Sequence, residues 1–300
     1  MSVVPRELDP ADRDDFLGLL DEVYGESMSP EEFDWFFDRN PAGPRLLAEV
    51  REDGRSLGVL AMSYARAEVE GDAQLVAFAV AAVTHPEARG RGIFGTLELD
   101  NEERAAAAGA TMALGFTNPM AGPILVGKLG WHDLYRMRLW ARPLRARRTG
   151  AGGLAPRSGG YLESFDARDE ELWRAEGYRN ALVRSAEYLT WRYLDAPRDY
   201  RVLGEEQGFA VVGHAVRKGF SAGVVCELVG PAHRLLRRCV RESKGCDIVL
   251  GVPGPGQRGA YLAAGFAPAP GTIRVIGKPL RDGVRIPDRW DFTLGDTDIF

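Results

Sequence analysis

Residues 89–94 of this chain combine glycine and arginine in an order that suits the binding of an anion. They are Arg-Gly-Arg-Gly-Ile-Phe, and they follow an apolar run at 75–83 and precede a helical pattern. Glycine lets the backbone approach a ligand without a Cβ in the way, and the N–H groups and dipole of a helix N-terminus favour negative charge. Arg89 and Arg91 add charge and donors. A pyrophosphate fits this chemistry, and an ordinary solvated turn is the alternative interpretation.

The segments around this loop predict a mixed α/β fold with a central sheet. Helical periodicity after Asp9 and a capping box at Ser29 predict two helices first. The continuous apolar run at 75–83 is typical of a strand buried on both faces. The other expected strands are 46–50, 57–63 and 112–116, and the later helices are 93–108 and 124–129.

The chain repeats itself. Trp191 lies 156 residues after Trp35, and a Pro follows each Trp by six residues. Later matches, such as 113–116 with 249–252, have an offset of 136. The second copy is therefore 20 residues shorter, and the loss falls where the first copy carries the Arg/Gly loop. The alternative is that these matches arose by chance, because Gly-aromatic and Pro-Leu pairs are common at turns and loops.

The loop resembles the acetyl-CoA signature of the GNAT (Gcn5-related N-acetyltransferase) superfamily, which is Arg or Gln, two residues, then Gly-x-Gly/Ala. Arg89 and Gly92 match, whereas Phe94 stands where Gly or Ala is usual. The resemblance extends over about 1–144 and includes Lys128-Leu129-Gly130-Trp131. It implies an α/β (α+β) fold of two tandem GNAT-like domains, each a mixed central sheet flanked by helices, with the second copy degenerate.

The resemblance also implies roles for particular residues. The strand before the loop splays from its neighbour, and its backbone at Ala82 and Val83 pairs with the pantetheine of the cofactor. Asn118 reaches the cofactor from the next strand, or alternatively caps the following helix. The residues expected to hold the pyrophosphate are Arg89, Gly90, Arg91, Gly92, Ile93 and Phe94.

The expected domains follow from the repeat. Residues 1–144 form the catalytic domain that binds acyl-CoA, and 161–285 form the degenerate copy. Between them, 145–160 is rich in Gly, Pro and Arg and is interpreted as a linker. Residues 286–300 form a C-terminal segment. The second copy passes from strand to helix through Gly230 and Pro231 without an Arg/Gly loop, so it is not expected to bind CoA.

The acid and base of the reaction are not fixed by the sequence. Val126 stands where many family members have a catalytic Tyr, and Tyr261 of the second copy is interpreted as a packing aromatic. Each candidate also has a non-catalytic interpretation, as part of a solvated helix end, as a surface residue or as part of an acidic solvated tail. The candidates are Tyr24, Glu26, His132, Tyr135, Asp296 and Asp298.

Bulk properties restrict the function further. A net charge of −5 argues against a nucleic-acid partner. The three cysteines lack metal-ligand spacing, so no metal is expected, and they suit a reducing compartment. With no signal-like N-terminus and no long apolar run, we expect a cytoplasmic protein without a membrane span. The Arg-rich composition suggests a bacterial source, and the oligomeric state stays open.

These observations predict an N-acyltransferase that uses acyl-CoA, with acetyl-CoA as the expected donor. The acceptor is the primary amine of a small molecule, which attacks the thioester directly. One alternative is a non-catalytic acyl-CoA-binding or scaffold module, favoured by the missing Tyr. Another is a Fem-type aminoacyl transferase, which would not require the loop at 89–94 and would favour a basic face.

Overall fold

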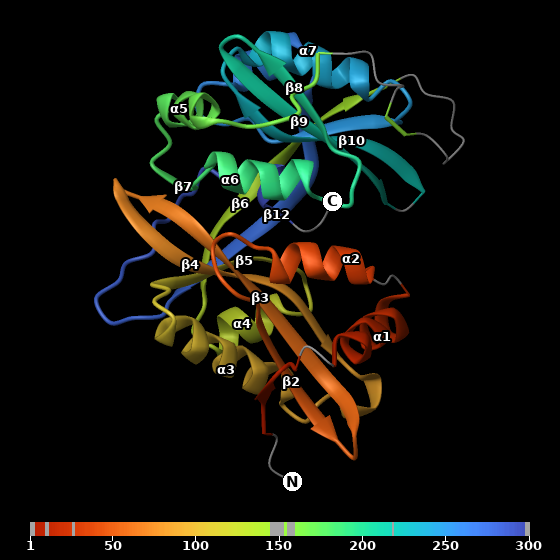
Figure 1. Cartoon of the computed structure of the whole chain (residues 1–300), viewed down its shortest axis with the longest axis vertical. Helices are drawn as coiled ribbons and strands as arrows, with labels where there is room; N and C mark the ends of the chain where they lie inside the picture. Colours follow the sequence, from red (N-terminus) through yellow and green to blue (C-terminus); the bar gives the residue numbers. More distant parts are fainter. Residues whose placement is uncertain are drawn as a thin grey trace. The chain divides into compact units, whose positions relative to one another are not determined.

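The computed structural model describes residues 4–9, 12–25, 28–144, 153–154, 160–217 and 219–297. The chain divides into two compact units, shown in Figure 1. Unit 1 comprises Met1–Tyr135 and Arg274–Asp288, and unit 2 comprises Arg136–Ile273 and Arg289–Phe300. No helix in the described part of the chain is both long and apolar enough to cross a membrane.

Unit 1 is a sheet in the order β1-β2-β3-β4-β5-β12, flanked by helices. The register is antiparallel from β1 to β4 and parallel between β4 and β5. The elements are β1 (Arg6–Glu7), α1 (Arg13–Tyr24), α2 (Pro30–Phe33), a π-helical turn (Asp34–Asp38), β2 (Leu46–Glu52), β3 (Arg55–Val69), β4 (Asp72–Thr84), a 3-10 turn (Pro86–Ala88), α3 (Ile93–Ala107), β5 (Met112–Thr117), α4 (Gly122–Lys128) and part of β12 (Ala267–Pro279).

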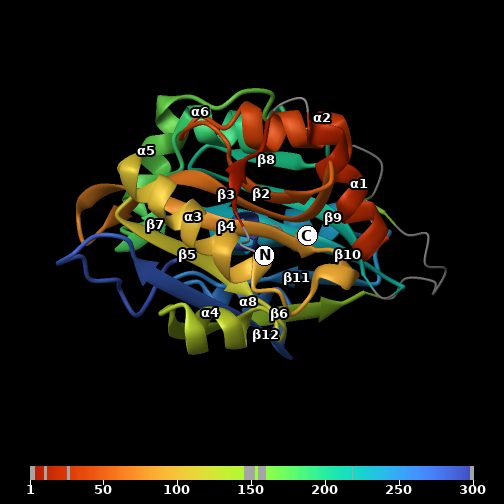
Figure 2. The ribbon, with the colours of Figure 1, turned by 90° about the horizontal axis from the view of Figure 1, so that it is seen from below.

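Two apolar layers cover the two faces of this sheet. Phe16 and Leu20 of α1 pack with Val59 and Val83 on one face, while Leu97 of α3 packs with residues of the other face. Figure 2 shows α1 and α2 on one side of the strands and α4 on the other. Local signals agree with this arrangement, because the capping box predicted at Ser29 is present.

Unit 2 contains strands in the order β6-β11-β10-β9-β8, again with helices packed on them. Its elements are part of β6 (His132–Pro143), α5 (Ala167–Ala175), β7 (Asn180–Leu182), α6 (Ala186–Leu189), a π-helical turn (Thr190–Leu194), β8 (Arg201–Glu205), β9 (Gly208–Arg217), β10 (Phe220–Val229), α7 (Ala232–Glu242), β11 (Ile248–Gly251), α8 (Arg258–Ala263) and a 3-10 turn (Leu294–Asp296).

The repeat seen in the sequence has a structural counterpart. The two π-helical turns, Asp34–Asp38 and Thr190–Leu194, lie at the offset of 156 residues. The strands β5 and β11 begin at the offset of 136 residues. After its π-helical turn, each run has three strands, a helix, a strand, a helix and a last strand in the same order. The shortening of the second run falls between its π-helical turn and β11.

The units do not coincide with the contiguous domains expected at 1–144 and 161–285. Arg274–Pro279 of β12 pair with β5 in unit 1, whereas Trp140–Pro143 of β6 pair with β11 in unit 2. Each copy therefore gives its last strand to the other unit. Sequence periodicity could not reveal this exchange, because it reports that a strand is buried but not which sheet receives it. Most of the expected linker at 145–160 lies outside the described residues.

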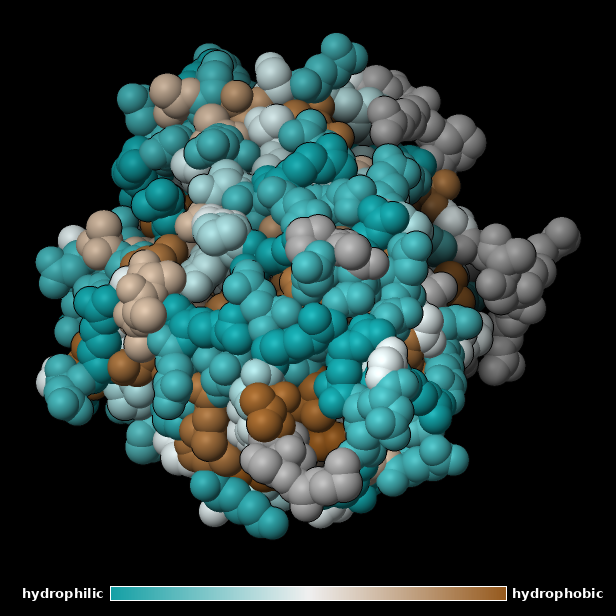
Figure 3. Space-filling view, turned by 60° about the horizontal axis from the view of Figure 1, so that its bottom comes forward, coloured by the Kyte–Doolittle hydropathy of each residue, from teal (hydrophilic) through white to brown (hydrophobic). Residues whose placement is uncertain are grey.

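Charged and polar residues predominate on the face drawn in Figure 3, where hydrophobic residues gather only in small groups. The large apolar side chains that are exposed are distributed over several elements. They include Leu99 of α3, Met120 before α4 and Leu262 of α8.

Candidate functional site

The sheet of unit 1 opens between β4 and β5. The two strands pair only over Val76–Ala79 and Met112–Gly115. Strand β4 continues to Thr84 and remains paired with β3 on its other side. A β-bulge leaves Val80 without a partner at the point of divergence. The backbone of β4 beyond the bulge, which includes Ala82 and Val83, therefore borders an opening in the sheet on the β5 side.

The loop after β4 has the backbone that an anion site requires. Gly90 and Gly92 have φ values of +83° and +80°, which disfavour any residue with a Cβ. Gly92 is the N-cap of α3 and supplies no side-chain cap, so the first N–H groups of α3 lack such a partner. Ile93 is buried and anchors the start of the helix, while Phe94 packs against the core at its edge.

The two arginines of the loop differ in their surroundings. Arg91 donates two hydrogen bonds to the carboxylate of Glu52, from Nη1 to Oε2 at 3.0 Å and from Nη2 to Oε1 at 2.9 Å. Arg89 is exposed and makes no ion pair with any residue that the structure describes. The sequence did not point to Glu52.

Tyr24 is the catalytic candidate that reaches β4. It ends α1, its side chain is 52% exposed, and its hydroxyl donates to the carbonyl oxygen of Ala82 at 2.8 Å. Gly25 closes the helix in the left-handed conformation, with φ of +68°. Glu26 lies outside the described residues. A phenol hydroxyl thus sits beside the splayed part of the strand.

The other residues of unit 1 that the sequence singled out for the site lie after β5, on β6 and on α4. The Oδ1 of Asn118 accepts from the backbone N–H groups of Met120 and Ala121, both at 2.9 Å, so the side chain caps the start of the α4 segment. His132 is exposed at the start of β6, and Tyr135 is half-buried three residues later. Val126 is half-buried against the apolar core.

His85, the residue after β4, also shapes the loop. Its Nδ1 accepts from the backbone N–H of Glu87 at 3.3 Å, so the side chain caps the 3-10 turn Pro86–Ala88. Its Nε2 lies 2.9 Å from the carboxylate of Glu22 and 2.7 Å from Arg55. The sequence did not indicate these two partners, because they come from α1 and from the β2–β3 hairpin.

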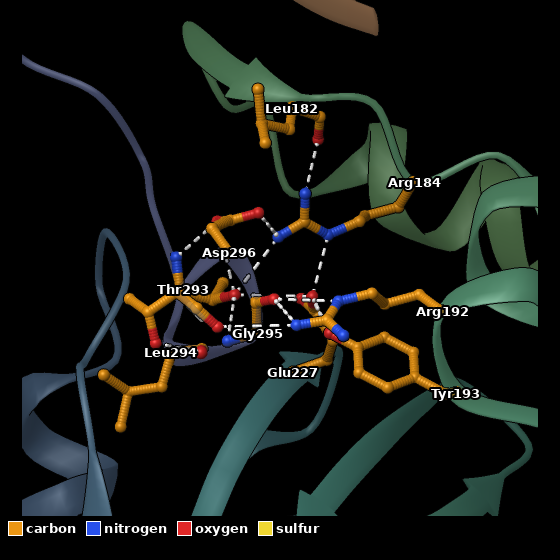
Figure 4. Close-up of polar contacts among 10 residues, drawn as sticks. Leu182, Arg184, Arg192, Tyr193, Glu227, Thr293, Leu294, Gly295 and Asp296 are labelled. Carbon is orange, nitrogen blue, oxygen red and sulfur yellow. Dashed lines mark hydrogen bonds and ion pairs between the residues drawn. The ribbon is translucent and has the colours of Figure 1, made fainter. Parts of the chain in front are cut away.

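Asp296 lies in a buried network of unit 2 (Figure 4). Its side chain has no exposed surface, and its Oδ1 is 2.8 Å from Nη2 of Arg184. Its Oδ2 accepts from the backbone N–H of Thr293 at 2.8 Å. The stacked rings of Trp290 and Phe292, with centroids 5.3 Å apart, anchor the segment. Asp298 lies outside the described residues.

The loop of unit 2 that corresponds to 85–92 has a different construction. Strand β10 ends at Val229 and α7 begins at Ala232. The N–H of Gly230 donates to the carboxylate of Glu176 at 2.7 Å, and a Cβ at Gly230 would lie 2.1 Å from the carbonyl oxygen of Gln207. An acidic side chain and the β8–β9 turn therefore occupy the place where an anion would approach. Tyr261 is fully buried against Trp140 and Phe266, as expected for a packing aromatic.

Helix α3 carries two buried carboxyl groups one turn apart. Glu102 accepts from Trp131 Nε1 at 2.8 Å and from Lys278 Nζ at 2.5 Å. Glu98 is 1% exposed, and its Oε1 has no hydrogen-bond partner among the described residues. Burial is the main cause that raises the pKa of Glu98 to about 8; the charge of Glu102 acts in the same direction, and Lys278 opposes both.

This raised pKa predicts that stability falls as the pH rises. Between the ordinary value of 4.5 and about 8, the folded chain holds a proton that the unfolded chain has released. The free energy of unfolding should therefore decrease across this window, by on the order of 3–5 kcal/mol. Urea titrations at pH 5, 7 and 9 measure it. Glu98→Gln should flatten the decrease, whereas Glu103→Gln, an exposed neighbour on α3, should keep it. A Glu98→Gln variant with the wild-type pH profile would contradict this explanation.

Comparisons with known proteins find one family model and several solved structures that resemble this chain. The family model for the acetyltransferase (GNAT) domain matches residues 4–132. A GCN5-related N-acetyltransferase from Kribbella flavida is 18% identical with a TM-score of 0.66, covering 93% of this chain and 72% of its own. One from Anabaena variabilis is 14% identical with a TM-score of 0.66, covering 93% and 73%.

A solved N-myristoyltransferase is also similar. The enzyme from Saccharomyces cerevisiae, determined with bound myristoyl-CoA and inhibitors, is 12% identical with a TM-score of 0.65 and covers 93% of this chain and 80% of its own. At such identities these structures show a shared fold. No curated protein matches the sequence.

Proposed function

We propose that the chain transfers an acyl group from acetyl-CoA to the primary amine of a small molecule, because residues 4–132 match the family model for the acetyltransferase (GNAT) domain. Unit 1 is the proposed catalytic part, and unit 2 is the proposed degenerate copy that does not bind CoA. The three described cysteines are unpaired and buried, which supports a reducing cytoplasmic setting.

One observation carries the proposal. Strand β4, which borders the opening toward β5, leads into the loop at 89–94 and then into α3. A ligand can therefore place an extended amide-bearing arm along β4 while its phosphates meet the N-terminus of α3. Acyl-CoA has this composition, with a pantetheine arm on one side of a pyrophosphate. The exposed Arg89 adds positive charge to the phosphate end.

The proposed reaction is direct attack on the thioester. The amine nitrogen bonds to the carbonyl carbon and loses one proton, the C–S bond breaks, and the thiolate of CoA takes up one proton. Backbone donors near Val83 would stabilise the oxyanion, because preorganised N–H groups favour charge that develops in the transition state. Binding in the opening also orients the thioester for attack.

Tyr24 is the residue we assign to proton transfer at this site. Its hydroxyl lies 2.8 Å from the carbonyl oxygen of Ala82, beside the place proposed for the thioester. From there it can protonate the departing thiolate. General acids contribute about 10²- to 10⁴-fold to a rate, so Tyr24→Phe should lower kcat by at least about tenfold while the Kd for CoA changes little.

Release of free CoA thiol from acetyl-CoA, measured with a broad panel of amines, tests the function. Turnover with at least one amine, and its reduction in Tyr24→Phe, is the expected result. Binding of acetyl-CoA without turnover on any amine would indicate a non-catalytic binding module. Absence of acetyl-CoA binding, combined with use of aminoacyl-tRNA, would indicate the Fem-type alternative.

A further inference from the structure

We propose that Glu52 controls the affinity of the site for acyl-CoA by competing with the phosphates for Arg91. This inference rests on the proposed function, because it assumes that residues 89–94 bind the phosphates. It adds a residue that lies outside the loop and that belongs to the hairpin between β2 and β3.

The contact between Glu52 and Arg91 uses both carboxylate oxygens and both terminal guanidinium nitrogens, at 2.9 and 3.0 Å. A carboxylate and a phosphate can each accept two hydrogen bonds from the planar guanidinium of arginine. Glu52 and a phosphate of CoA would therefore compete for the same donors of Arg91. In the ligand-free protein Arg91 is thus committed to Glu52. It can turn to a phosphate only by leaving that carboxylate.

The hairpin is held beside the loop by a second set of contacts. Arg55, three residues after Glu52, lies 2.7 Å from Nε2 of His85. The same guanidinium is 3.4 Å from Glu22 and 3.6 Å from Glu87. The turn between Glu52 and Arg55 is tight, since Asp53 and Gly54 both have positive φ values. The fold of the hairpin therefore positions Glu52 beside Arg91, and the contact does not depend on the conformations of the two side chains alone.

The two arginines then take different parts in binding. Arg89, which has no ion pair among the described residues, is available to a phosphate from the start. Arg91 contributes only after its pair with Glu52 opens. Neutralising Glu52 removes the competition for Arg91, so the affinity for CoA should rise.

Calorimetric titration of CoA into Glu52→Gln tests the inference. The Kd should fall about two- to fivefold, the range that corresponds to an exposed ion pair. Asp53→Asn is the matched control, because it removes the same charge from the exposed neighbouring position and Asn tolerates a positive φ. Asp53→Asn should leave the Kd within about twofold of the wild-type value, since long-range charge effects are screened by salt.

A double variant makes the test specific. Arg91→Ala should weaken binding, and Glu52→Gln should have no further effect in that background. An unchanged or higher Kd in Glu52→Gln would overturn the inference, and so would an equal gain in the presence and absence of Arg91. Failure of the wild-type protein to bind CoA would overturn the proposed function, and the inference with it.

Discussion

Asp296→Ala is expected to destabilise unit 2 by about 3–5 kcal/mol, the usual cost of leaving a buried charge without its partner. The guanidinium of Arg184 is 2% exposed, and Asp296 is one of its two carboxylate partners, at 2.8 Å. Without Asp296 the other partner, Glu227, must balance Arg184 alone. The cap of the turn at Thr293 is lost as well. Urea unfolding followed by tryptophan fluorescence measures the change.

The network explains why this position should be so sensitive. Glu227 Oε1 accepts from Arg184 Nε at 2.8 Å and from the hydroxyl of Tyr193 at 2.6 Å (Figure 4). Arg192 donates to the carbonyl oxygen of Gly295 at 3.1 Å. Gly295 itself fits closely, because a Cβ there would lie 2.0 Å from the Tyr193 hydroxyl. The C-terminal segment thus completes the polar interior of unit 2.

Asp288→Ala is the control, since Asp288 is exposed and should change stability by less than about 0.5 kcal/mol. Asp296→Asn distinguishes a structural from a catalytic role. We expect it to lose stability with the ion pair. A variant of Asp296 as stable as the wild type, but without turnover, would instead return Asp296 to the candidates for the catalytic base.

Gly92→Asp is expected to weaken acetyl-CoA binding by at least about 100-fold. It places a carboxylate at the N-cap of α3, where the phosphates are proposed to lie, and that carboxylate would itself cap the helix N–H groups. Repulsion from a phosphate at short range adds to the effect. The thermal shift produced by acetyl-CoA, compared between variant and wild type, reports the loss by mass action.

The chain offers a matched control for the backbone change. Gly283 has φ of +77°, close to the +80° of Gly92, and a Cβ at either position meets no atom within 4 Å. Gly283→Asp should therefore carry the same backbone strain, about 1–3 kcal/mol, and retain acetyl-CoA binding. Equal loss of binding in the two variants would mean that Gly92→Asp acts through stability rather than through the phosphates.

The parts of the fold that depend on local chemistry could be predicted from the sequence. The capping box at Ser29 marked a helix start because its effect acts over one turn. The repeat paired the segments of Trp35 and Trp191, since it needs only a comparison of the chain with itself, and both segments form π-helical turns in the structure.

The rest depends on contacts between distant segments. The pairing of Arg91 with Glu52, and of Gly230 with Glu176, joins residues from different hairpins and helices. The exchange of β6 and β12 between the units depends on which sheet edge each strand reaches. Asp296 was a candidate for the catalytic acid or base, and its burial beside Arg184 could not be predicted from the sequence of the C-terminal segment. Such pairings follow from tertiary register, which a single sequence does not report.

We propose that unit 1 alone binds acyl-CoA. Calorimetric titration of acetyl-CoA into the wild-type chain measures this, because the stoichiometry counts the sites. We expect one acetyl-CoA per chain, and none in Gly92→Asp. Two acetyl-CoA molecules per chain, or one that persists in Gly92→Asp, would contradict it.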